Sequence, residues 1–354
     1  MGGIVPKLAH HAHMRNLPDV VKEAIQKANL GDRGVQEIDV IAVTRVDPEF
    51  KVLTRTGDSP RNSDDAALVA PLGPDPYPPF PFLTLLVSGG HTMLLVAHSV
   101  DRYTTLATTV DDSIGEAFDK TARELDIPWL PGRAGGPGAS LEEFAKTSTT
   151  PARYLDQLPI PMSLRASKHE MKFSFAGLKS AVTRVVNHEK KTSASGQMDE
   201  DKKRDLAAGF QHCAVTHLCQ KVEQGLRDCR KQGIDISSLV ISGGVGRNAT
   251  LRKKMDSVCQ QFEYSLAKPS QKPKTAAGGG SSVDGTQHGT SSMTDTTRRA
   301  VQVICPPPKL CTDNAVMIAW TGLERYQLGL VDPYDIDIVP KWPLDMLGTG
   351  VIPE

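Results

Sequence analysis

Two short segments of the sequence end in a pair of glycines at the point where a buried strand is expected to stop. They are Leu85–Gly90, ending in Ser88-Gly89-Gly90, and Leu239–Gly244, ending in Ser242-Gly243-Gly244. Because glycine has no Cβ, a ligand can approach the backbone closely at such a turn. Successive free N–H groups there form a cradle suited to phosphate, and a tight structural turn is the alternative.

The two segments are also near copies of each other. This predicts two lobes of related design that face each other across a cleft, although coincidence between two buried strands is the alternative. Neither segment matches the dinucleotide fingerprint or the Walker loop, so the NAD and P-loop classes are disfavoured. Two glycine pairs at matching strand ends favour a ligand site over a purely structural turn.

Three polar side chains are candidates for ligand contacts. Asn248 opens an expected helix, so it is either an N-cap or a group that holds a ribose hydroxyl or a base edge. Asp119 lies off the apolar face of an expected helix, where a solvated carboxylate is the simpler interpretation. Asp313 is either a helix cap or, if it faces a cleft, a metal ligand or a base.

The charge balance limits how the chain could bind polyanions. Lys and Arg number 41 and Asp and Glu number 41, so the chain has no net charge at pH 7. A neutral chain does not coat nucleic acid or an anionic membrane by bulk charge, so such binding needs a local patch. One basic cluster follows the second glycine pair and is either that patch or a solvated helix face; its members are Arg247, Arg252, Lys253 and Lys254.

The sequence disfavours several other classes of protein. No apolar run approaches the ~18 residues that a membrane span needs, so no membrane partner is expected. The six cysteines form no Cys-x-x-Cys pair, which argues against a zinc ribbon and a dense disulfide scaffold and favours reduced thiols in an intracellular protein. No His-Glu-x-x-His stands in the chain, so a metallopeptidase is disfavoured.

Hydrophobic spacing and capping residues predict an α/β protein whose elements position these side chains. Helices are expected at 7–30, 113–125 (capped by Asp111 or Asp112), 206–229, 249–262 and 313–328, with another beginning at 141–145. Strands are expected at 38–43, 82–87, 92–96, 239–241 and 301–304. Residues 173–179 are expected to form a strand that turns into a helix ending at Val186.

Composition divides the chain further. Prolines crowd residues 55–81, and Gly, Ser, Thr and Lys dominate residues 266–300. The expected organisation is a partial N-terminal lobe at 1–43, a proline-rich or disordered linker at 44–81, the rest of that lobe at 82–150, and a C-terminal lobe at 151–345 with a disordered insertion at 266–300.

The ordered series of motifs resembles the tRNA N6-adenosine threonylcarbamoyltransferase family of the TsaD type, formerly named O-sialoglycoprotein endopeptidase. The resemblance covers about residues 2–43 and 80–345 apart from the insertion, and the form of residues 173–179 is similar to the bacterial and mitochondrial branch. The motifs are Leu86–Thr92, Asp111-Asp112, Gly115–Ala122, Gly135–Pro137, Phe173–Lys179, Ser242–Val245, Asn248–Arg252 and Cys311–Asn314.

The resemblance implies an actin-like, hexokinase-like (ASKHA) fold of two related lobes. It implies transfer of a threonylcarbamoyl group from threonylcarbamoyl-AMP, made by a partner synthase, to N6 of adenosine 37 in tRNAs that read codons beginning with A. The implied partners are therefore tRNA and that synthase, with a possible homodimer. The implied location is mitochondrial, and cytoplasmic otherwise.

By matching position, the resemblance also assigns site residues. One divalent metal ion is assigned to Asp313. The acyl-adenylate is assigned to the backbone N–H groups of 86–90 and to side chains from both lobes. The full set of substrate-binding candidates is Leu86, Val87, Ser88, Gly89, Gly90, Asp119, Gly136, Ser140, Arg247, Asn248 and Thr312.

Two departures from the family pattern lead to an alternative. The family begins with a strand and an acidic segment ahead of the point where this chain starts, and it carries a His-x-x-x-His metal pair where residues 44–81 contain no histidine. One carboxylate does not make a tight metal site. We therefore expect an incomplete N-terminal lobe and little transferase activity. The alternatives are a catalytically silent, nucleotide-binding homologue or partner subunit, and a kinase-like ATP-hydrolysing enzyme.

Overall fold

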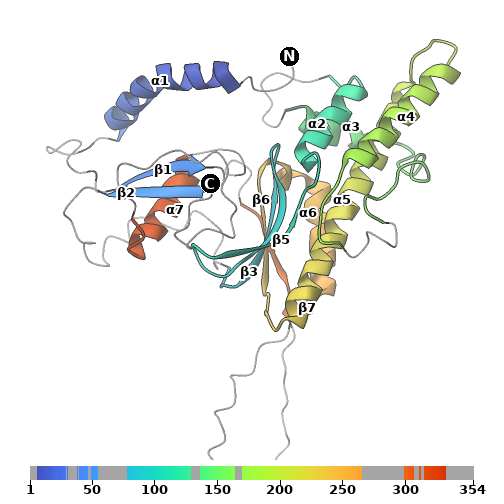
Figure 1. The fold of residues 1–354 in the computed structure, drawn as a ribbon. Coiled ribbons are helices and arrows are strands. Elements are labelled where there is room, and N and C mark those ends of the chain that lie inside the picture. The colour runs from blue at the N-terminus through green and yellow to red at the C-terminus, as the bar shows by residue number, and fades with distance from the viewer. Residues whose placement is uncertain are drawn as a thin grey trace, which may run out of the picture. The chain divides into compact units, whose positions relative to one another are not determined.

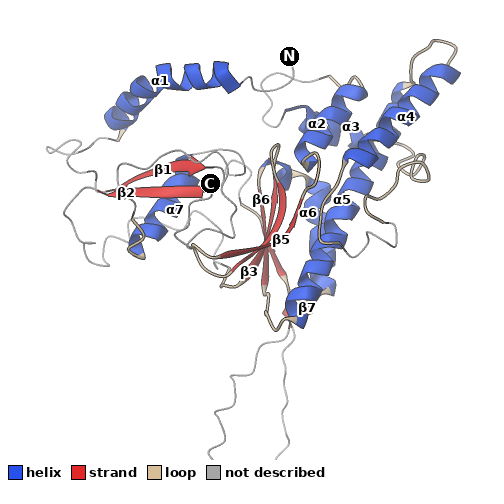
Figure 2. Ribbon diagram, in the orientation of Figure 1, coloured by secondary structure: helices blue, strands red, loops and turns tan. Residues whose placement is uncertain are grey.

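The computed structural model describes residues 6–28, 30, 38, 40–46, 49–54, 78–128, 136–163, 170–264, 299–306, 311 and 315–331. These residues belong to two units. Unit 1 holds α1, β1, β2 and α7, and unit 2 holds the elements from β3 to β9 (Figures 1 and 2).

Unit 1 is built on a hairpin of β1 (Val40–Val46) and β2 (Glu49–Thr54), with α7 (Ala315–Gln327) packed against both strands. α1 (Pro6–Lys27) precedes the hairpin. The strand expected at 38–43 therefore continues to Val46, and β2 lies in the segment predicted to be a linker. The prolines of 60–81 follow β2 in the sequence, and Pro48 stands between the two strands and not within either, so no proline removes a donor from the β1–β2 pairing.

Unit 2 contains a five-stranded mixed sheet in the order β5-β4-β3-β6-β9. β3 (Phe82–Val87), β4 (Thr92–Ala97) and β5 (Tyr103–Thr108) form an antiparallel meander, and the expected hairpin between β3 and β4 is confirmed. β6 (Ser238–Ser242) runs parallel to β3 on its other side, and β9 (Gln302–Ile304) runs parallel to β6.

The two strands that end in Ser-Gly-Gly are therefore neighbours in one sheet, with Leu86 opposite Ser242. The prediction that they face each other from two lobes across a cleft is wrong for this structure. Parallel strands end at the same edge of a sheet, so both glycine turns emerge side by side. The predicted boundary between lobes at residue 150 also falls inside unit 2.

Five α-helices of the described residues pack in unit 2 and lie to one side of the sheet in Figure 1. They are α2 (Ile114–Glu124), α3 (Gly136–Lys146), α4 (Ala176–Thr192), α5 (Glu200–Lys231) and α6 (Ala249–Gln261). The longest, α5, buries a stripe that includes Phe210, Ala214 and Leu218. This stripe follows the three- and four-residue spacing of a core-facing helix.

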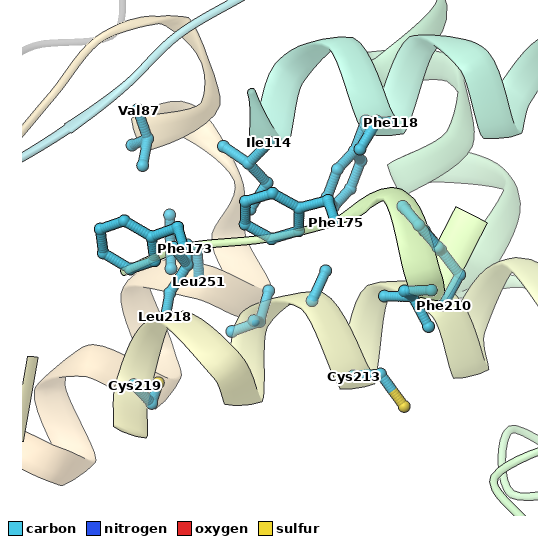
Figure 3. Packing of buried hydrophobic residues seen from close by; sticks show 14 of the residues in the cluster. Val87, Ile114, Phe118, Phe173, Phe175, Phe210, Cys213, Leu218, Cys219 and Leu251 are labelled. Atoms are coloured by element: carbon cyan, nitrogen blue, oxygen red, sulfur yellow. The ribbon is translucent and has the colours of Figure 1, made fainter. Parts of the chain in front are cut away.

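Aromatic side chains from α2, α5 and the segment before α4 meet in the core of unit 2 (Figure 3). Phe118 of α2 packs edge-to-face on Phe210 of α5, with ring centroids 5.1 Å apart. Phe173 and Phe175 both pack edge-to-face on the buried His217. Burial lowers the pKa of His217 to about 4, so this imidazole is neutral at physiological pH.

The N-terminus of α2 is capped by Ser113. The sequence-based prediction of Asp111 or Asp112 as the cap is wrong. The Ser113 hydroxyl accepts a hydrogen bond from the Glu116 N–H. The Asp111 carboxylate instead accepts hydrogen bonds from the Ser174 hydroxyl and the Phe175 N–H. These two hydrogen bonds join the segment before α4 to the loop before α2, which are more than 60 residues apart in the sequence.

Other expected boundaries move by a few residues. α3 begins at Gly136, inside the glycine-rich segment, and α4 continues six residues past Val186 to Thr192. Phe173 forms a single bridge to Thr109 where a strand was expected. α5 begins earlier than residue 206 because Asp199 caps it.

The long insertion leaves and re-enters unit 2 at one place. β7 (Glu263–Tyr264) pairs antiparallel with β8 (Arg299–Ala300), so the chain returns beside its point of departure. Residues 265–298 themselves lie outside the described residues, as do 55–77. None of the six cysteines forms a disulfide, and within the described part no helix has the length and apolar character needed to cross a membrane.

Candidate functional site

A cavity of about 460 Å³ lies where the first glycine turn, α2, α3 and the start of α6 meet. Its wall contains five glycines, together with acidic, basic and apolar side chains. The lining residues are Gly89, Gly115, Phe118, Asp119, Gly136, Gly138, Ala139, Ser140, Glu142, Glu143, Lys146, Gly244, Val245, Arg247, Asn248 and Ala249. A wall rich in backbone with a few charged groups suits a polar ligand that approaches the main chain.

The first glycine turn is held rigidly against the start of α2. The Ser113 hydroxyl donates a 2.6 Å hydrogen bond to the Gly89 carbonyl, and the Gly115 N–H donates to the Ser88 carbonyl. A Cβ on Gly115 would lie 2.5 Å from that same carbonyl oxygen. Only glycine therefore permits α2 to approach the turn this closely.

The second glycine turn is held against the first by the pairing of β3 with β6. Gly243 has a φ of 95°, and a Cβ there would collide with the backbone carbonyl of Val87. The neighbouring Gly244 has open space around it and lines the cavity. One glycine of the pair is thus required by the fold, and the other faces the cavity.

The backbone N–H groups of the first turn are mostly engaged within the turn itself. The N–H groups of Gly90 and His91 donate to the Ser88 hydroxyl, and the Ser88 N–H donates to the His91 carbonyl. The expected cradle of free N–H groups from Leu86 to Gly90 is therefore not formed at Ser88 or Gly90. The Ser88 hydroxyl accepts the N–H groups that follow it, as serine hydroxyls commonly do in turns.

Asp119 joins α2 to α3 at the cavity wall. Its carboxylate accepts a 2.7 Å hydrogen bond from the Gly138 N–H, near the start of α3. Burial raises the pKa of Asp119, and the bond from Gly138 opposes this rise only in part. The interpretation of Asp119 as a simple solvated carboxylate is therefore wrong. One carboxylate oxygen has a backbone partner while the residue lines the cavity.

Asn248 is the N-cap of α6, as the structural interpretation of the sequence predicted. It is 5% exposed, and its amide oxygen accepts a 2.9 Å bond from the Leu251 N–H. Its amide nitrogen donates to the Gln211 side chain at 2.9 Å. Asn248 lines the cavity, but its amide group already has a protein partner on both sides.

The charges of the cavity come from Asp119, from α3 and from Arg247. Lys146 pairs with Glu143 at 2.7 Å and with Glu142 at 3.5 Å, and the bond to Glu143 raises the pKa of Lys146. Glu142 also accepts a hydrogen bond from the Ala249 N–H. Arg247 has no ion pair among the described residues, so it is the lining cation whose charge no neighbouring carboxylate offsets.

The structure brings together six of the predicted substrate-binding residues, namely Gly89, Asp119, Gly136, Ser140, Arg247 and Asn248. Four others, Leu86, Val87, Ser88 and Gly90, lie in β3 or its turn and do not line the cavity; the Val87 side chain is fully buried in the core. Thr312 and Asp313 lie outside the described residues.

Sequence reasoning missed several lining residues, among them Glu142 and Lys146. Both lie on α3 with the four-residue spacing that puts them on one helix face. That spacing was visible in the sequence. Nothing local, however, indicated that this face is turned toward the start of α6.

The described residues contain no group of three or more His, Cys, Asp or Glu side chains that could hold a metal ion. Asp313, the predicted ligand, lies outside them. The described residues therefore include no site for the divalent metal that the resemblance implied, and no chemical step below depends on one.

Comparison with known proteins gives a consistent result. The family model "TsaD: tRNA N6-adenosine threonylcarbamoyltransferase" matches residues 1–46 and 62–278. An Arabidopsis thaliana protein named as a probable mitochondrial tRNA N6-adenosine threonylcarbamoyltransferase is 33% identical over 97% of this chain and 67% of its own length. A Novosphingobium aromaticivorans protein with the same enzyme name is 33% identical over 97% of this chain and 83% of its own.

A Schizosaccharomyces pombe protein, named as the mitochondrial enzyme, is 30% identical over 98% of this chain and 77% of its own. The glycine turns, Asp119 and the start of α6, which form the cavity, all lie within the segments that the family model matches. This chain belongs to the tRNA N6-adenosine threonylcarbamoyltransferase (TsaD) family.

Proposed function

We propose that this chain transfers a threonylcarbamoyl group from threonylcarbamoyl-AMP to N6 of an adenosine in tRNA. The observation that carries the proposal is the cavity of about 460 Å³, in which six residues assigned to the substrate by resemblance lie together. Its volume is in the range of small-molecule sites, and its lining combines glycine backbone with charged groups. The names of the similar proteins support this reaction and lend no support to a catalytically silent homologue.

The reaction needs positioning more than a protein nucleophile. The exocyclic amine of adenosine attacks the activated carbonyl carbon and a C–N bond forms. The bond from that carbon to the phosphate oxygen of AMP breaks, and the amine nitrogen releases one proton to solvent. AMP carries away the negative charge that develops on the leaving phosphate. A protein that holds both reactants in this geometry and offsets that charge supplies most of the catalysis.

The cavity residues suit these tasks. Arg247 is the lining cation without an ion pair among the described residues, so we assign it to the AMP phosphate. Asp119, whose carboxylate is already oriented by the Gly138 N–H, is assigned to a ribose hydroxyl. Gly89 and Gly244 have open space around them and permit the ligand to approach the backbone.

The test supplies threonylcarbamoyl-AMP from a partner synthase with threonine, bicarbonate and ATP, and measures the modified nucleoside in digested tRNA by mass spectrometry. We expect product with the wild-type chain and at least roughly a tenfold loss of rate with Arg247→Ala. The matched control is Arg227→Ala, an exposed arginine of α5 outside the cavity that pairs with Glu223. Equal rates for the two variants, or no product from the wild-type chain, would contradict the proposal.

The same proposal includes the finer features of the family. Unit 2 would be the nucleotide-binding part of an actin-like fold with two lobes, and tRNA and a synthase that delivers threonylcarbamoyl-AMP would be partners of a monomer or homodimer. A mitochondrial location is supported by the names of the Arabidopsis and fission-yeast relatives. Fractionation of source cells with an antibody against the chain tests the location, and light scattering tests the oligomeric state.

Thr312 and Asp313 remain predictions as a substrate contact and a metal ligand. Because one carboxylate does not hold a divalent ion tightly, we expect less than one equivalent of metal after dialysis. Elemental analysis of the dialysed chain and of Asp313→Ala measures this directly. A full equivalent that disappears in Asp313→Ala would show a complete site built with ligands beyond the described residues.

A further inference from the structure

A second cavity, of about 560 Å³, lies between α2 and α4. Its lining is strongly basic, with four cationic side chains and a single acidic one. The cations are Lys120, Arg123, Lys179 and Arg184, and the acid is Glu124. The proposed transfer reaction uses none of these residues.

Lys120 and Lys179 both form ion pairs with the Asp112 carboxylate. Asp112 accepts hydrogen bonds from Lys120 at 2.8 Å and from Lys179 at 2.5 Å, so it ties α2 to α4. Lys120 also pairs with Glu116 at 2.8 Å. Asp112 and Glu116 therefore offset the two lysine charges, and these pairs mainly fix the spacing of the two helices.

The two arginines are different. Neither Arg123 nor Arg184 has an ion pair among the described residues, and both are exposed. On α4, Ser180, Arg184, Asn187 and Lys191 are exposed at the spacing of a single helix face. This face therefore presents arginine, lysine, hydroxyl and amide donors to solvent, and these are the groups that contact phosphate oxygens in nucleic-acid complexes.

A buried hydroxyl also lines the cavity without a partner. Thr121 is fully buried, and its hydroxyl oxygen has no hydrogen-bond partner in the described part of the protein. Because this hydroxyl has no exposed surface, the inference below does not depend on it.

The basic cluster that the sequence offered as the alternative is largely used inside the fold. Arg252 donates a 2.6 Å bond to the Gly246 carbonyl, and Lys254 donates to the Thr216 hydroxyl and contacts His212. Arg247 lines the nucleotide cavity. Only Lys253 of that cluster is exposed, so the cluster is not a continuous basic surface.

We propose that the face formed by Arg123, Arg184 and Lys191 on α2 and α4 binds phosphate groups of the tRNA backbone. This inference rests on the proposed function, which makes tRNA the substrate, and adds the surface that holds it. A chain with no net charge needs such a local patch to bind a polyanion, because its overall field does not attract one.

The experiment measures the affinity of the full chain for tRNA by fluorescence anisotropy at several salt concentrations. For Arg123→Ala/Arg184→Ala we expect roughly tenfold weaker binding, and a log–log salt slope that is shallower by about 0.7–0.9 for each phosphate that the variant no longer neutralises. Arg123→Lys/Arg184→Lys keeps both charges and should retain most of the affinity. Glu124→Gln, which removes the one lining carboxylate, should bind tRNA more tightly.

The matched control is Lys253→Ala, which removes an exposed cation elsewhere in unit 2 and should bind like the wild-type chain. A double alanine variant that binds tRNA with unchanged affinity and salt dependence would overturn the inference, as would an equal loss in Lys253→Ala. Nucleotide affinity, measured by calorimetry with AMP, separates this inference from the proposed function. It should stay unchanged in the double variant, whereas failure of AMP to bind the wild-type chain counts against the nucleotide cavity alone.

Discussion

Two faces of one helix, α2, line two cavities of different character. On one side Gly115, Phe118 and Asp119 face a cavity walled by glycine turns, in which most charges are paired. On the other side Lys120, Arg123 and Glu124 face a basic cavity beside α4. The first cavity is shaped by backbone approach and tight packing, and the second by side-chain charge.

This difference has a consequence for mutation. Groups around the nucleotide cavity also hold the fold together, because the glycine turns and the α6 cap are packed in the core. Groups on the basic face extend into solvent and carry little folding free energy. Substitutions of the tightly packed glycines and of the α6 cap should therefore cost stability, and substitutions on the basic face should leave it unchanged.

The largest effect is expected for Gly243→Ala. Its φ of 95° disfavours any side chain, and the new Cβ would collide with the Val87 carbonyl. We expect a loss of at least about 2 kcal/mol in the free energy of unfolding, measured by urea denaturation. Gly244→Ala is the matched control, because no atom lies within 4 Å of the position of its Cβ. Equal losses in the two variants would show that the contact between the strands is not what requires Gly243.

A smaller loss is expected for Asn248→Ala, which removes the cap of α6 and the partner of Gln211. The expected cost is about 1–2 kcal/mol in thermal or urea unfolding. Asn248→Ser retains a capping hydroxyl and should recover part of this stability. If Asn248→Ser is stable but loses AMP affinity, Asn248 also contacts the nucleotide; if AMP affinity follows stability in both variants, its role is structural.

Asp119→Asn should distinguish charge from packing at the nucleotide cavity. The amide can still accept the Gly138 hydrogen bond, but it has no charge to bury. The pKa of Asp119 is raised in the folded chain, so the protonated carboxyl favours folding relative to the ionised one. This contribution to stability is fully present below the ordinary Asp pKa of 3.8 and is lost as the pH rises through the folded value.

At pH 7 the Asp119→Asn variant should therefore be at least as stable as the wild-type chain, and this advantage should disappear as the pH falls below 3.8. Unfolding by urea at several pH values measures it. A variant that is less stable at pH 7 would show that the favourable partners of the ionised carboxylate, the Gly138 N–H and the charge of Arg123, outweigh the cost of its burial. AMP affinity should fall in the variant, because an amide is a weaker acceptor for a ribose hydroxyl.

The smallest effect on stability is expected on the basic face. Arg123→Ala/Arg184→Ala should change the free energy of unfolding by less than about 0.5 kcal/mol per residue, because neither arginine is buried or ion-paired among the described residues. Urea denaturation gives the value. A loss comparable to that of Asn248→Ala would remove the contrast between the two sides of α2.

Much of the local structure follows from residue patterns. The β3–β4 hairpin, α2, α5 and the Asn248 cap could all be predicted, because alternation, helical spacing and capping depend on neighbouring residues. The wrong prediction that Asp111 or Asp112 caps α2 also came from considering neighbouring residues alone. An Asp before a helix is a usual cap, but here its carboxylate binds Ser174 and Phe175, which are distant in sequence.

The sequence by itself determined the family, the two glycine turns and several of the residues that line the nucleotide cavity, because these depend on motifs and on residue type. Only the tertiary structure decided that β3 and β6 are parallel neighbours, that Glu142 reaches the start of α6, and that Arg123 and Arg184 share a face. These features join segments far apart in the chain. Their positions depend on how the helices and the sheet pack together, which no local pattern specifies.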